Sequence, residues 1–167
     1  MVDLSAQRIG IFVDVQNMYY SARNLYGRKV NFNEIMKTAI AKRQLVRAMA
    51  YVIKAEEEKE DTFFDALHKI GFEVRSKDLQ TFIGGSKKGD WDIGLAMDVL
   101  KISAKLDVIV LVSGDGDFVD LVRYVKELHG CRVEIMAFGE TTSSKLIEEA
   151  HQFVDMSKGK DRYLIHK

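Results

Sequence analysis

The stretch VIVLVSGDGDFVDLV, residues 108–122, places two acidic side chains on a glycine-rich turn directly after an apolar run. The five residues Val108–Val112 are apolar and mostly β-branched, a composition typical of a buried strand. Asp115 and Asp117 follow on the turn. Two carboxylates this close repel one another, and each resists leaving water unless a cation or hydrogen-bond donors compensate. The stretch therefore predicts a buried strand that ends at a site for something positively charged.

Further apolar runs predict more strands, and helical patterns lie between them. The other predicted strands are residues 9–13, 45–53 and 132–138, with weaker candidates at 72–75 and 153–156. The predicted helices are residues 32–42, 59–70, 91–103, 118–129 and 143–150. This alternation implies right-handed crossovers and a mostly parallel sheet covered on both faces. The sequence thus predicts a three-layer α/β domain, in which the two most apolar runs, 9–13 and 108–112, form the central pair.

Length and composition limit the possible functions. A chain of 167 residues fits one domain, which we place at residues 1–156, followed by a basic tail at 157–167 that either frays or forms a short helix. The 25 Lys and Arg balance the 25 Asp and Glu, so a polyanion would have to be held by a local patch or through metal ions. That balance disfavours a protein that only binds nucleic acid through a general basic field.

The cysteine count and the hydropathy pattern bear on the compartment. Cys131 is the single cysteine and cannot form an intramolecular disulfide, which suits the reducing cytoplasm. The N-terminus lacks the basic-then-apolar pattern of a signal peptide, and no apolar run approaches the roughly 20 residues that a membrane span needs. We expect a soluble cytoplasmic protein with no membrane partner; a homodimer remains open.

Four aspartates are expected to meet in one crevice. Asp14 ends the first predicted strand, and Asp115 and Asp117 follow the fourth. Ligand sites of parallel sheets form at the carboxyl ends of strands where the strand order reverses. Asp92 lies in the first turn of the predicted helix at 91–103, whose residues are apolar almost all round, so we expect that helix to be buried and to aim Asp92 at the same crevice.

Oxygen ligands without histidine or cysteine favour Mg²⁺ or Mn²⁺ over zinc. The four histidines are scattered, and none has ligand spacing. Asp98 lies six residues after Asp92, which turns it some 120° away on a helix, so one ion can hardly take both. Asp98 is therefore a structural acid, an indirect support for the ligands, or a partner for nearby basic groups. The alternative for Asp117 and Asp90 is helix capping, and for Asn17 an Asx turn.

Other chemistries fit less well. The segment GDGDF lacks the third glycine of a dinucleotide fingerprint, where Val119 stands, and its acids would repel a pyrophosphate. An aspartyl phosphatase would need an acid where Gln16 stands, and a phospho-receiver domain would need paired acids and a later lysine that are missing. Ser113 has no histidine in a credible position to activate it as a nucleophile, so a turn hydroxyl or a hydrogen bond to a metal ligand fits better.

Three ordered motifs, FVDVQNMYYSA (residues 12–22), KKGDWDIGLAMDVL (87–100) and LVSGDGDFVDLVRYVKELHG (111–130), together resemble the NYN domain family. Within it the chain is similar to the LabA-like branch of the PIN-like nuclease superfamily, over about residues 8–156. The resemblance implies a PIN-like Rossmannoid with strand order 3-2-1-4-5, so that the first and fourth strands lie side by side.

The resemblance also implies a metal-dependent ribonuclease. Its acidic residues carry over to Asp14, Asp92, Asp115 and Asp117 as ligands of Mg²⁺ or Mn²⁺. Asn17 would orient a metal-bound water or a phosphate, and Ser113 would hydrogen-bond Asp14 or another ligand. Asp98 matches a family position of less defined role. An alternative of another class is a non-catalytic RNA-binding or regulatory protein-interaction module that retains the metal pocket.

Substrate contacts are expected near the second motif. Lys87 and Lys88 could contact a phosphate backbone, and Trp91 could stack on a base or simply belong to the core. The basic residues Lys54, Arg75 and Lys77 could extend this track. An open crevice favours single-stranded RNA over a duplex. A Mg²⁺-dependent phosphatase is a further possibility, and it would release phosphate from a small monoester without shortening RNA.

Overall fold

The computed structural model describes residues 3–54, 60–78, 80–81, 87–88 and 90–166. Six strands form one sheet in the order β3-β2-β1-β6-β7-β8, and every neighbouring pair is parallel. They are β1 (Arg8–Asp14), β2 (Gln44–Lys54), β3 (Glu73–Asp78), β6 (Val108–Val112), β7 (Arg132–Ala137) and β8 (Gln152–Asp155). A separate antiparallel pair joins β4 (Gln80–Thr81) to β5 (Lys87–Lys88).

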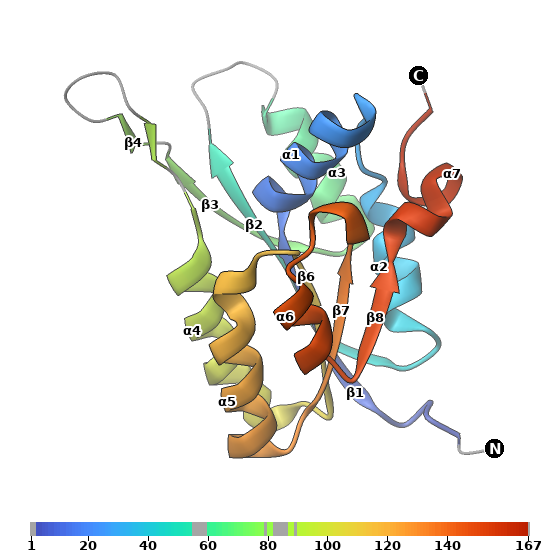
Figure 1. Cartoon of the computed structure of the whole chain (residues 1–167), viewed down its shortest axis with the longest axis vertical. Coiled ribbons are helices and arrows are strands. Elements are labelled where there is room, and N and C mark those ends of the chain that lie inside the picture. Colours follow the sequence, from blue (N-terminus) through green and yellow to red (C-terminus); the bar gives the residue numbers. More distant parts are fainter. Residues whose placement is uncertain (1–2, 55–59, 79, 82–86, 89, 167) are drawn as a thin grey trace.

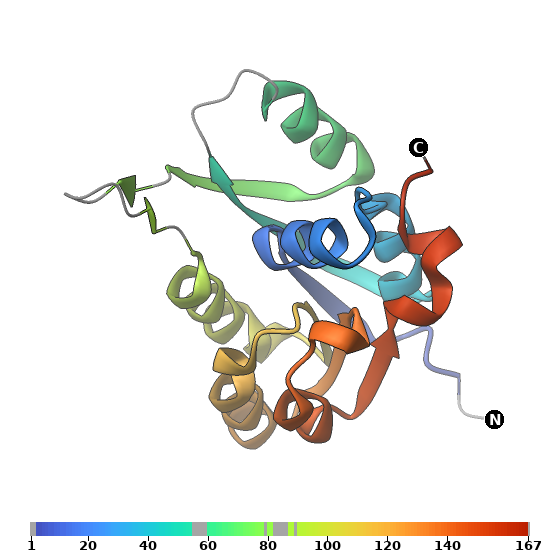
Figure 2. The same cartoon turned by 45° about the horizontal axis from the view of Figure 1, so that its top comes forward.

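Helices cover both faces of the sheet (Figure 1). They are α1 (Val15–Tyr26), α2 (Phe32–Ile40), α3 (Glu60–Ile70), α4 (Asp92–Ile102), α5 (Val119–His129), α6 (Ser144–Glu149) and α7 (Lys160–Tyr163). Figure 2 shows α1, α2 and α3 on one side of the sheet and α4, α5 and α6 on the other. Two buried apolar clusters fill the two interfaces. The predicted three-layer α/β fold is therefore confirmed.

The predicted strand order 3-2-1-4-5 is also confirmed when the strands of the main sheet are counted along the chain. The sixth strand, β8, forms at the weak candidate 153–156, and β3 forms at the weak candidate 72–75. The strand β1 pairs with β2 on one side and β6 on the other. Its inner residues are buried on both faces: Ile11 packs toward the α1 side and Phe12 toward the α4 side.

Two helical predictions need correction. The helix α4 is not buried all round, since Ile93 is 76% exposed and Met97 is 51% exposed, whereas Leu95 and Val99 are buried. Its apolar composition predicted burial, but the helix packs on the sheet through one side only, so the opposite side reaches solvent. The helix α1 was not predicted from the sequence, because only four of its twelve residues are buried and the rest are largely polar.

The C-terminal tail forms a short helix, one of the two alternatives expected. The hydroxyls of Tyr163 and Thr38 lie 3.0 Å apart, and Leu164 pairs with Val30 in an isolated antiparallel bridge. Both Tyr163 and Leu164 are buried, so α7 packs on α2. Within the residues that the structure describes, no helix is both long enough and apolar enough to span a bilayer.

Candidate metal centre

The centre lies at the carboxyl ends of β1 and β6. These strands pair through Val13 and Val112, so the next residues, Asp14 and Ser113, emerge side by side. The chain then leaves β1 into α1 on one face of the sheet and leaves β6 toward α5 on the other (Figure 2). This reversal opens the crevice in which open α/β sheets place their ligands.

Asp14 is the buried member of the site, at 8% exposure. Its Oδ2 accepts a hydrogen bond from the Ser113 hydroxyl at 3.1 Å, and its Oδ1 accepts one from the Asn17 backbone N–H at 3.2 Å. The second bond makes Asp14 the N-cap of α1. The Asp14 carboxylate thus caps α1 and faces the crevice, and a hydrogen bond to each of its two oxygens fixes its orientation.

Asp115 is presented by the glycine-rich turn after β6. Its backbone N–H donates to the Ser113 hydroxyl oxygen at 3.2 Å, and its Oδ1 accepts from the Asp117 N–H at 2.9 Å. A Cβ at Gly114 would lie 2.9 Å from the hydroxyl oxygen of Thr142, too close for a real side chain. Glycine therefore lets the turn lie against the loop after β7 and so fixes where Asp115 points.

Asp92 completes the group from the first turn of α4. Asp14, Asp92 and Asp115 each offer one carboxylate oxygen, and these three oxygens lie within 4.8 Å of one another. About eighty residues separate Asp14 from Asp92, so only the fold brings them together. We refer to Asp14, Asp92 and Asp115 as the acidic triad.

The other buried acids have basic partners. Asp98 is 6% exposed and pairs with Arg75, and Glu134 is 7% exposed and pairs with Arg43 at 2.8 Å. Asp14 is buried to a similar degree, yet in the described part of the chain it has no ion pair and instead faces two further carboxylates. A buried carboxylate is stable only when its charge is compensated. Three converging carboxylate oxygens fit a hard divalent cation such as Mg²⁺ or Mn²⁺.

Electrostatics in the metal-free site favour protons. Burial raises the pKa of Asp14 to about 6, although hydrogen bonds from Asn17 and Ser113 act in the opposite direction. Burial, followed by the charges of Asp115 and Asp14, raises the pKa of Asp92 to about 7. Asp92 therefore holds a proton up to about neutral pH and Asp14 up to about pH 6, and a cation that binds there must displace these protons.

We expect the stabilisation by Mg²⁺ or Mn²⁺ to depend steeply on pH. Because the folded-state pKa values of Asp14 and Asp92 lie above the ordinary value of 3.8, these groups stabilise the metal-free fold at low pH, and that contribution is lost as pH rises from about 4 through 7. At pH 8 both acids are ionised, and a hundredfold excess of metal over its Kd should raise the Tm by about 5–10 °C. At pH 5 the increase should vanish.

Thermal unfolding with and without metal at the two pH values measures this. The Asp120→Asn variant is the control, because Asp120 is 95% exposed and lies outside the acidic triad. It should respond to metal as the wild type does. Equal stabilisation at pH 5 and pH 8 would show that the acids titrating near neutrality are not the ones that bind the cation.

The remaining residues expected at the site fall into different places. Asp117 is exposed and is not part of the acidic triad. The side-chain oxygen of Asn17 accepts from the Gly114 N–H at 3.0 Å, so it ties α1 to the glycine-rich turn. Asp98 lies on the side of α4 that faces the sheet, where it accepts from the Tyr51 hydroxyl at 2.8 Å.

Trp91 is half-buried and belongs to the core cluster on the α4 side. Its indole N–H donates to the Val52 carbonyl at 3.0 Å, and Arg75 and Lys77 lie over its ring at 5.4 and 5.2 Å. A Cβ at Gly94 would clash with the ring, so this glycine makes room for it. The core alternative for Trp91 is thus the better supported one. Base stacking by Trp91 stays a prediction.

Lys87 and Lys88 form β5, and their side chains lie outside the described residues. Of the basic residues expected to extend the track, Lys54 is exposed, and Lys77 donates to the Asp90 carbonyl at 2.9 Å. Lys77 therefore ties β3 to the segment before α4.

One side of the crevice was not predicted from the sequence. A cavity of about 290 Å³ contains the acidic triad and is also lined by residues of α1, the segment before α4 and the loop after β7, namely Gln16, Tyr20, Ser21, Asn24, Asp90 and Thr141. Gln16, Tyr20 and Asn24 recur every four residues, which places them on one face of a helix. That spacing is visible in the sequence, but it indicates a shared face only if residues 15–26 form a helix, which the sequence patterns did not predict.

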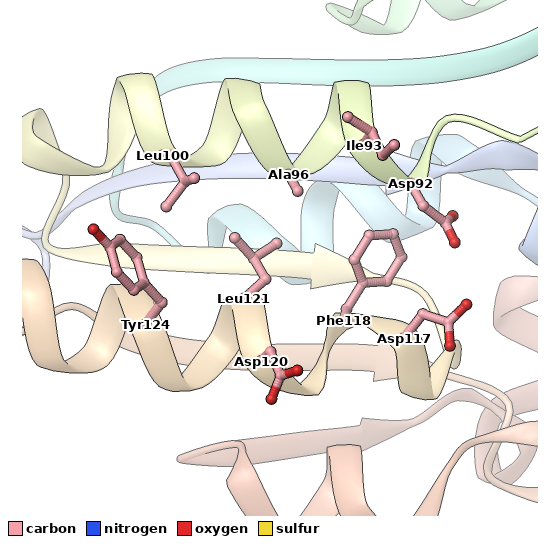
Figure 3. Close-up of a pocket in the computed structure, with 9 residues that line it drawn as sticks. All are labelled: Asp92, Ile93, Ala96, Leu100, Asp117, Phe118, Asp120, Leu121 and Tyr124. Atoms are coloured by element: carbon pink, nitrogen blue, oxygen red, sulfur yellow. The ribbon is translucent and has the colours of Figure 1, made fainter.

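A second hollow of about 400 Å³ runs between α4 and α5 (Figure 3). Its walls are mostly apolar, with Ile93, Ala96 and Leu100 on α4 facing Leu121 and Tyr124 on α5 and Phe118 just before it. Asp92 and Asp117 lie at one end, and Asp120 lies along the α5 side. Asp92 lines both hollows.

Comparisons with known proteins agree with the motifs. The chain is 27% identical to the low amplitude and bright protein LabA of Synechococcus elongatus over 90% of this chain and 84% of that protein. It superposes on the crystal structure of a protein of unknown function from Vibrio parahaemolyticus with a TM-score of 0.88 and 35% identity, covering 99% of this chain and 100% of the other. The family model described as the NYN domain matches residues 8–157. The chain therefore belongs to the NYN domain family, as its three motifs indicated.

Proposed function

We propose that the protein is a metal-dependent ribonuclease that hydrolyses phosphodiester bonds at the acidic triad. The observation that carries this proposal is the convergence of Asp14, Asp92 and Asp115 within 4.8 Å at the crevice between β1 and β6. Buried and half-buried acids with raised pKa values are costly to keep unless they bind a cation. Membership of the NYN family supports the same reading.

The residues of the chain take distinct roles in this proposal. Asp14, Asp92 and Asp115 would hold Mg²⁺ or Mn²⁺, which supplies the positive charge that acidifies a water and neutralises charge on the attacked phosphate. The Ser113 hydroxyl and the Asn17 backbone N–H fix the orientation of Asp14. Asp117 is exposed at the rim of the neighbouring hollow, from where its carboxylate could reach a water or an ion on the outer side.

Single-stranded RNA is the proposed substrate because the cavity is an open crevice beside polar and aromatic side chains of α1. A strand laid there would bring one phosphate to the acidic triad. Lys87 and Lys88, on β5 shortly before α4, are the proposed contacts for the flanking phosphates. The net charge of zero makes such local contacts and the cation itself the means of holding a polyanion.

Cleavage of end-labelled RNA oligonucleotides by the purified protein tests the proposal. Shortened products should form with Mn²⁺ or Mg²⁺ and disappear when EDTA is added. A parallel assay with a small phosphomonoester should release no phosphate. RNA that is bound but left intact under all metal conditions would rule out the ribonuclease and favour a non-catalytic RNA-binding module, whereas phosphate release without shortening would indicate a phosphatase.

A further inference from the structure

One face of α1 forms a wall of the cavity that contains the acidic triad. Gln16, Tyr20 and Asn24 all line that cavity, and their spacing of four residues aligns them along the helix. The stripe begins two residues after Asp14 and extends about 12 Å along the axis, at 1.5 Å per residue. It therefore leads directly away from the acidic triad.

The chemistry of this stripe is unusual for an exposed helix face. Tyr20 is 48% exposed, and its ring lies edge-on to that of Tyr19, with centroids 5.4 Å apart. An aromatic ring beside open space offers a face for stacking, and the amides of Gln16 and Asn24 offer both donors and acceptors on either side of it. Arg23 is exposed one turn from Tyr20, at a spacing that makes the two neighbours on the helix.

The second hollow offers an exposed ring, Tyr124, but no side-chain amide among its described lining residues. Its walls are mostly apolar, and the acids Asp117 and Asp120 stand along it. A bound cation would offset the charge of the acidic triad but not that of Asp117 and Asp120, which would repel the backbone of a nucleic acid. On the α1 side Asp90 is the one acid outside the triad among the described lining residues, and Arg23 beside Tyr20 would attract the backbone. A strand that passes over the acidic triad is therefore directed along α1.

We propose that this face of α1 is a nucleobase subsite, in which Tyr20 stacks on the base next to the cleaved phosphodiester and the Gln16 and Asn24 amides contact the edge of that base. The inference rests on the ribonuclease function proposed above and names how its substrate is gripped. Stacking on an aromatic ring tolerates every base, whereas one amide that contacts a base edge through both its donor and its acceptor favours adenine. The subsite thus binds single-stranded RNA with a preference for adenine at one position beside the cut.

Steady-state cleavage by the Tyr20→Ala variant is the first test. Loss of stacking should raise KM by about tenfold or more and change kcat by less than about threefold, because Tyr20 touches the base and not the reacting phosphate. Tyr20→Phe keeps the ring and should stay within about threefold of the wild type. Tyr124→Ala is the matched control, since Tyr124 is 52% exposed on α5 and lines only the second hollow.

An abasic nucleotide placed at successive positions of the substrate identifies the base involved. The wild type should bind the substrate more weakly when the abasic nucleotide stands at one position next to the cut. Tyr20→Ala should bind that abasic substrate and the intact one equally well. If the loss of affinity caused by Tyr20→Ala and the loss caused by the abasic nucleotide added together, the subsite would be overturned. Both changes remove the same stacking contact, so its free energy can be lost only once.

Binding read without turnover separates the subsite from the nuclease. A single-stranded oligonucleotide carrying 2-aminopurine, bound in Ca²⁺, should lose fluorescence with the wild type and Tyr20→Phe but not with Tyr20→Ala. Metal-dependent cleavage with no effect of Tyr20→Ala on KM or fluorescence overturns the subsite and leaves the nuclease standing. Tyr20-dependent quenching without any cleavage overturns the nuclease and leaves a base-binding site, and the absence of both overturns both.

Discussion

Replacing Asp115 by Asn is expected to lower metal-dependent RNA cleavage by about a thousandfold or more while making the metal-free domain more stable. The substitution removes one of the three carboxylate charges that converge within 4.8 Å. A thousandfold loss corresponds to about 4 kcal/mol of activation free energy, within the several kcal/mol that a correctly held metal ion supplies. Relief of repulsion among the acidic triad should stabilise the metal-free fold by about 1–2 kcal/mol.

Asn is the right replacement because it keeps the local structure. The Asp115 side-chain oxygen accepts from the Asp117 N–H at 2.9 Å, and an Asn oxygen can accept the same bond. Single-turnover cleavage in Mn²⁺ and urea unfolding in EDTA measure the two effects. The same change at exposed Asp120 is the matched control and should alter neither.

The opposite directions of the two effects make the prediction specific. A variant that merely unfolds would lose both activity and stability, whereas a lost ligand costs activity and gains metal-free stability. The variant should also lose the increase in Tm that metal gives the wild type at pH 8. Cleavage that persists unchanged in Asp115→Asn would point to a contaminating nuclease and would contradict the assignment of the acidic triad as the active site.

Local sequence patterns predicted the sheet well because parallel strands buried on both faces leave a continuous apolar run. The runs in β1 and β6 identified the central pair, and the acids at their ends followed from where parallel strands place ligands. Asp92 was found because the apolar composition of its helix predicted a helix held against the sheet, and α4 does pack on the sheet, although through one side only. These inferences depend on short stretches of sequence and one general rule of topology.

The side of the crevice formed by α1 was missed for a physical reason. The helix lies on the sheet through a narrow stripe of buried residues, including Met18 and Ala22, and the rest of its length is largely polar, so no continuous apolar run marks it. Two signals did mark it. Asp14 is its N-cap, and Gly27 ends it with a φ of 63°. Because Asp14 had been read as a metal ligand, its second role as a helix start was overlooked.

Contacts between distant segments could not be predicted in the same way. The sequence showed that Asp98 points away from Asp92 and left a partner for basic groups among its possible roles. It gave no means of choosing Arg75 and Tyr51, which come from β3 and β2. Such partners are set by how the helix α4 lies across the sheet, and that depends on the packing of the whole layer.

Replacing Asp98 by Ala is expected to destabilise the protein by about 2–4 kcal/mol and to weaken metal binding about tenfold, although Asp98 is not part of the acidic triad. Asp98 is 6% exposed, accepts from the Tyr51 hydroxyl at 2.8 Å and pairs with Arg75 at 2.5 Å. Burial, with the Asp98 hydrogen bond next, raises the pKa of Tyr51, so the hydroxyl stays protonated as a donor. Removing the acceptor leaves the buried Tyr51 hydroxyl with only the Met49 sulfur, a weak acceptor at 3.5 Å, and Arg75, which is 45% exposed, can only partly recover its hydration.

The effect on metal binding follows from where these contacts hold α4. Asp98 joins the middle of α4 to β2 and β3, and the acidic-triad member Asp92 stands at the start of the same helix. Without these contacts α4 can shift relative to the strands, and Asp92 shifts with it. The three carboxylate oxygens of the acidic triad are then less often close enough together to bind one ion. Isothermal titration with Mn²⁺ and urea unfolding measure the two consequences.

A matched control and a double variant separate positioning from general damage. Glu73→Ala, at the start of β3, breaks the exposed ion pair between Glu73 and Arg47 of β2. It should lower the free energy of unfolding by less than about 1 kcal/mol with no change in metal affinity. Tyr51→Phe combined with Asp98→Ala should cost less than the sum of the single changes, because both remove one buried hydrogen bond. If Asp98→Ala lowered stability as expected but left Mn²⁺ affinity unchanged, α4 would hold Asp92 by other contacts, such as Trp91 on Val52, and Asp98 would serve the fold alone.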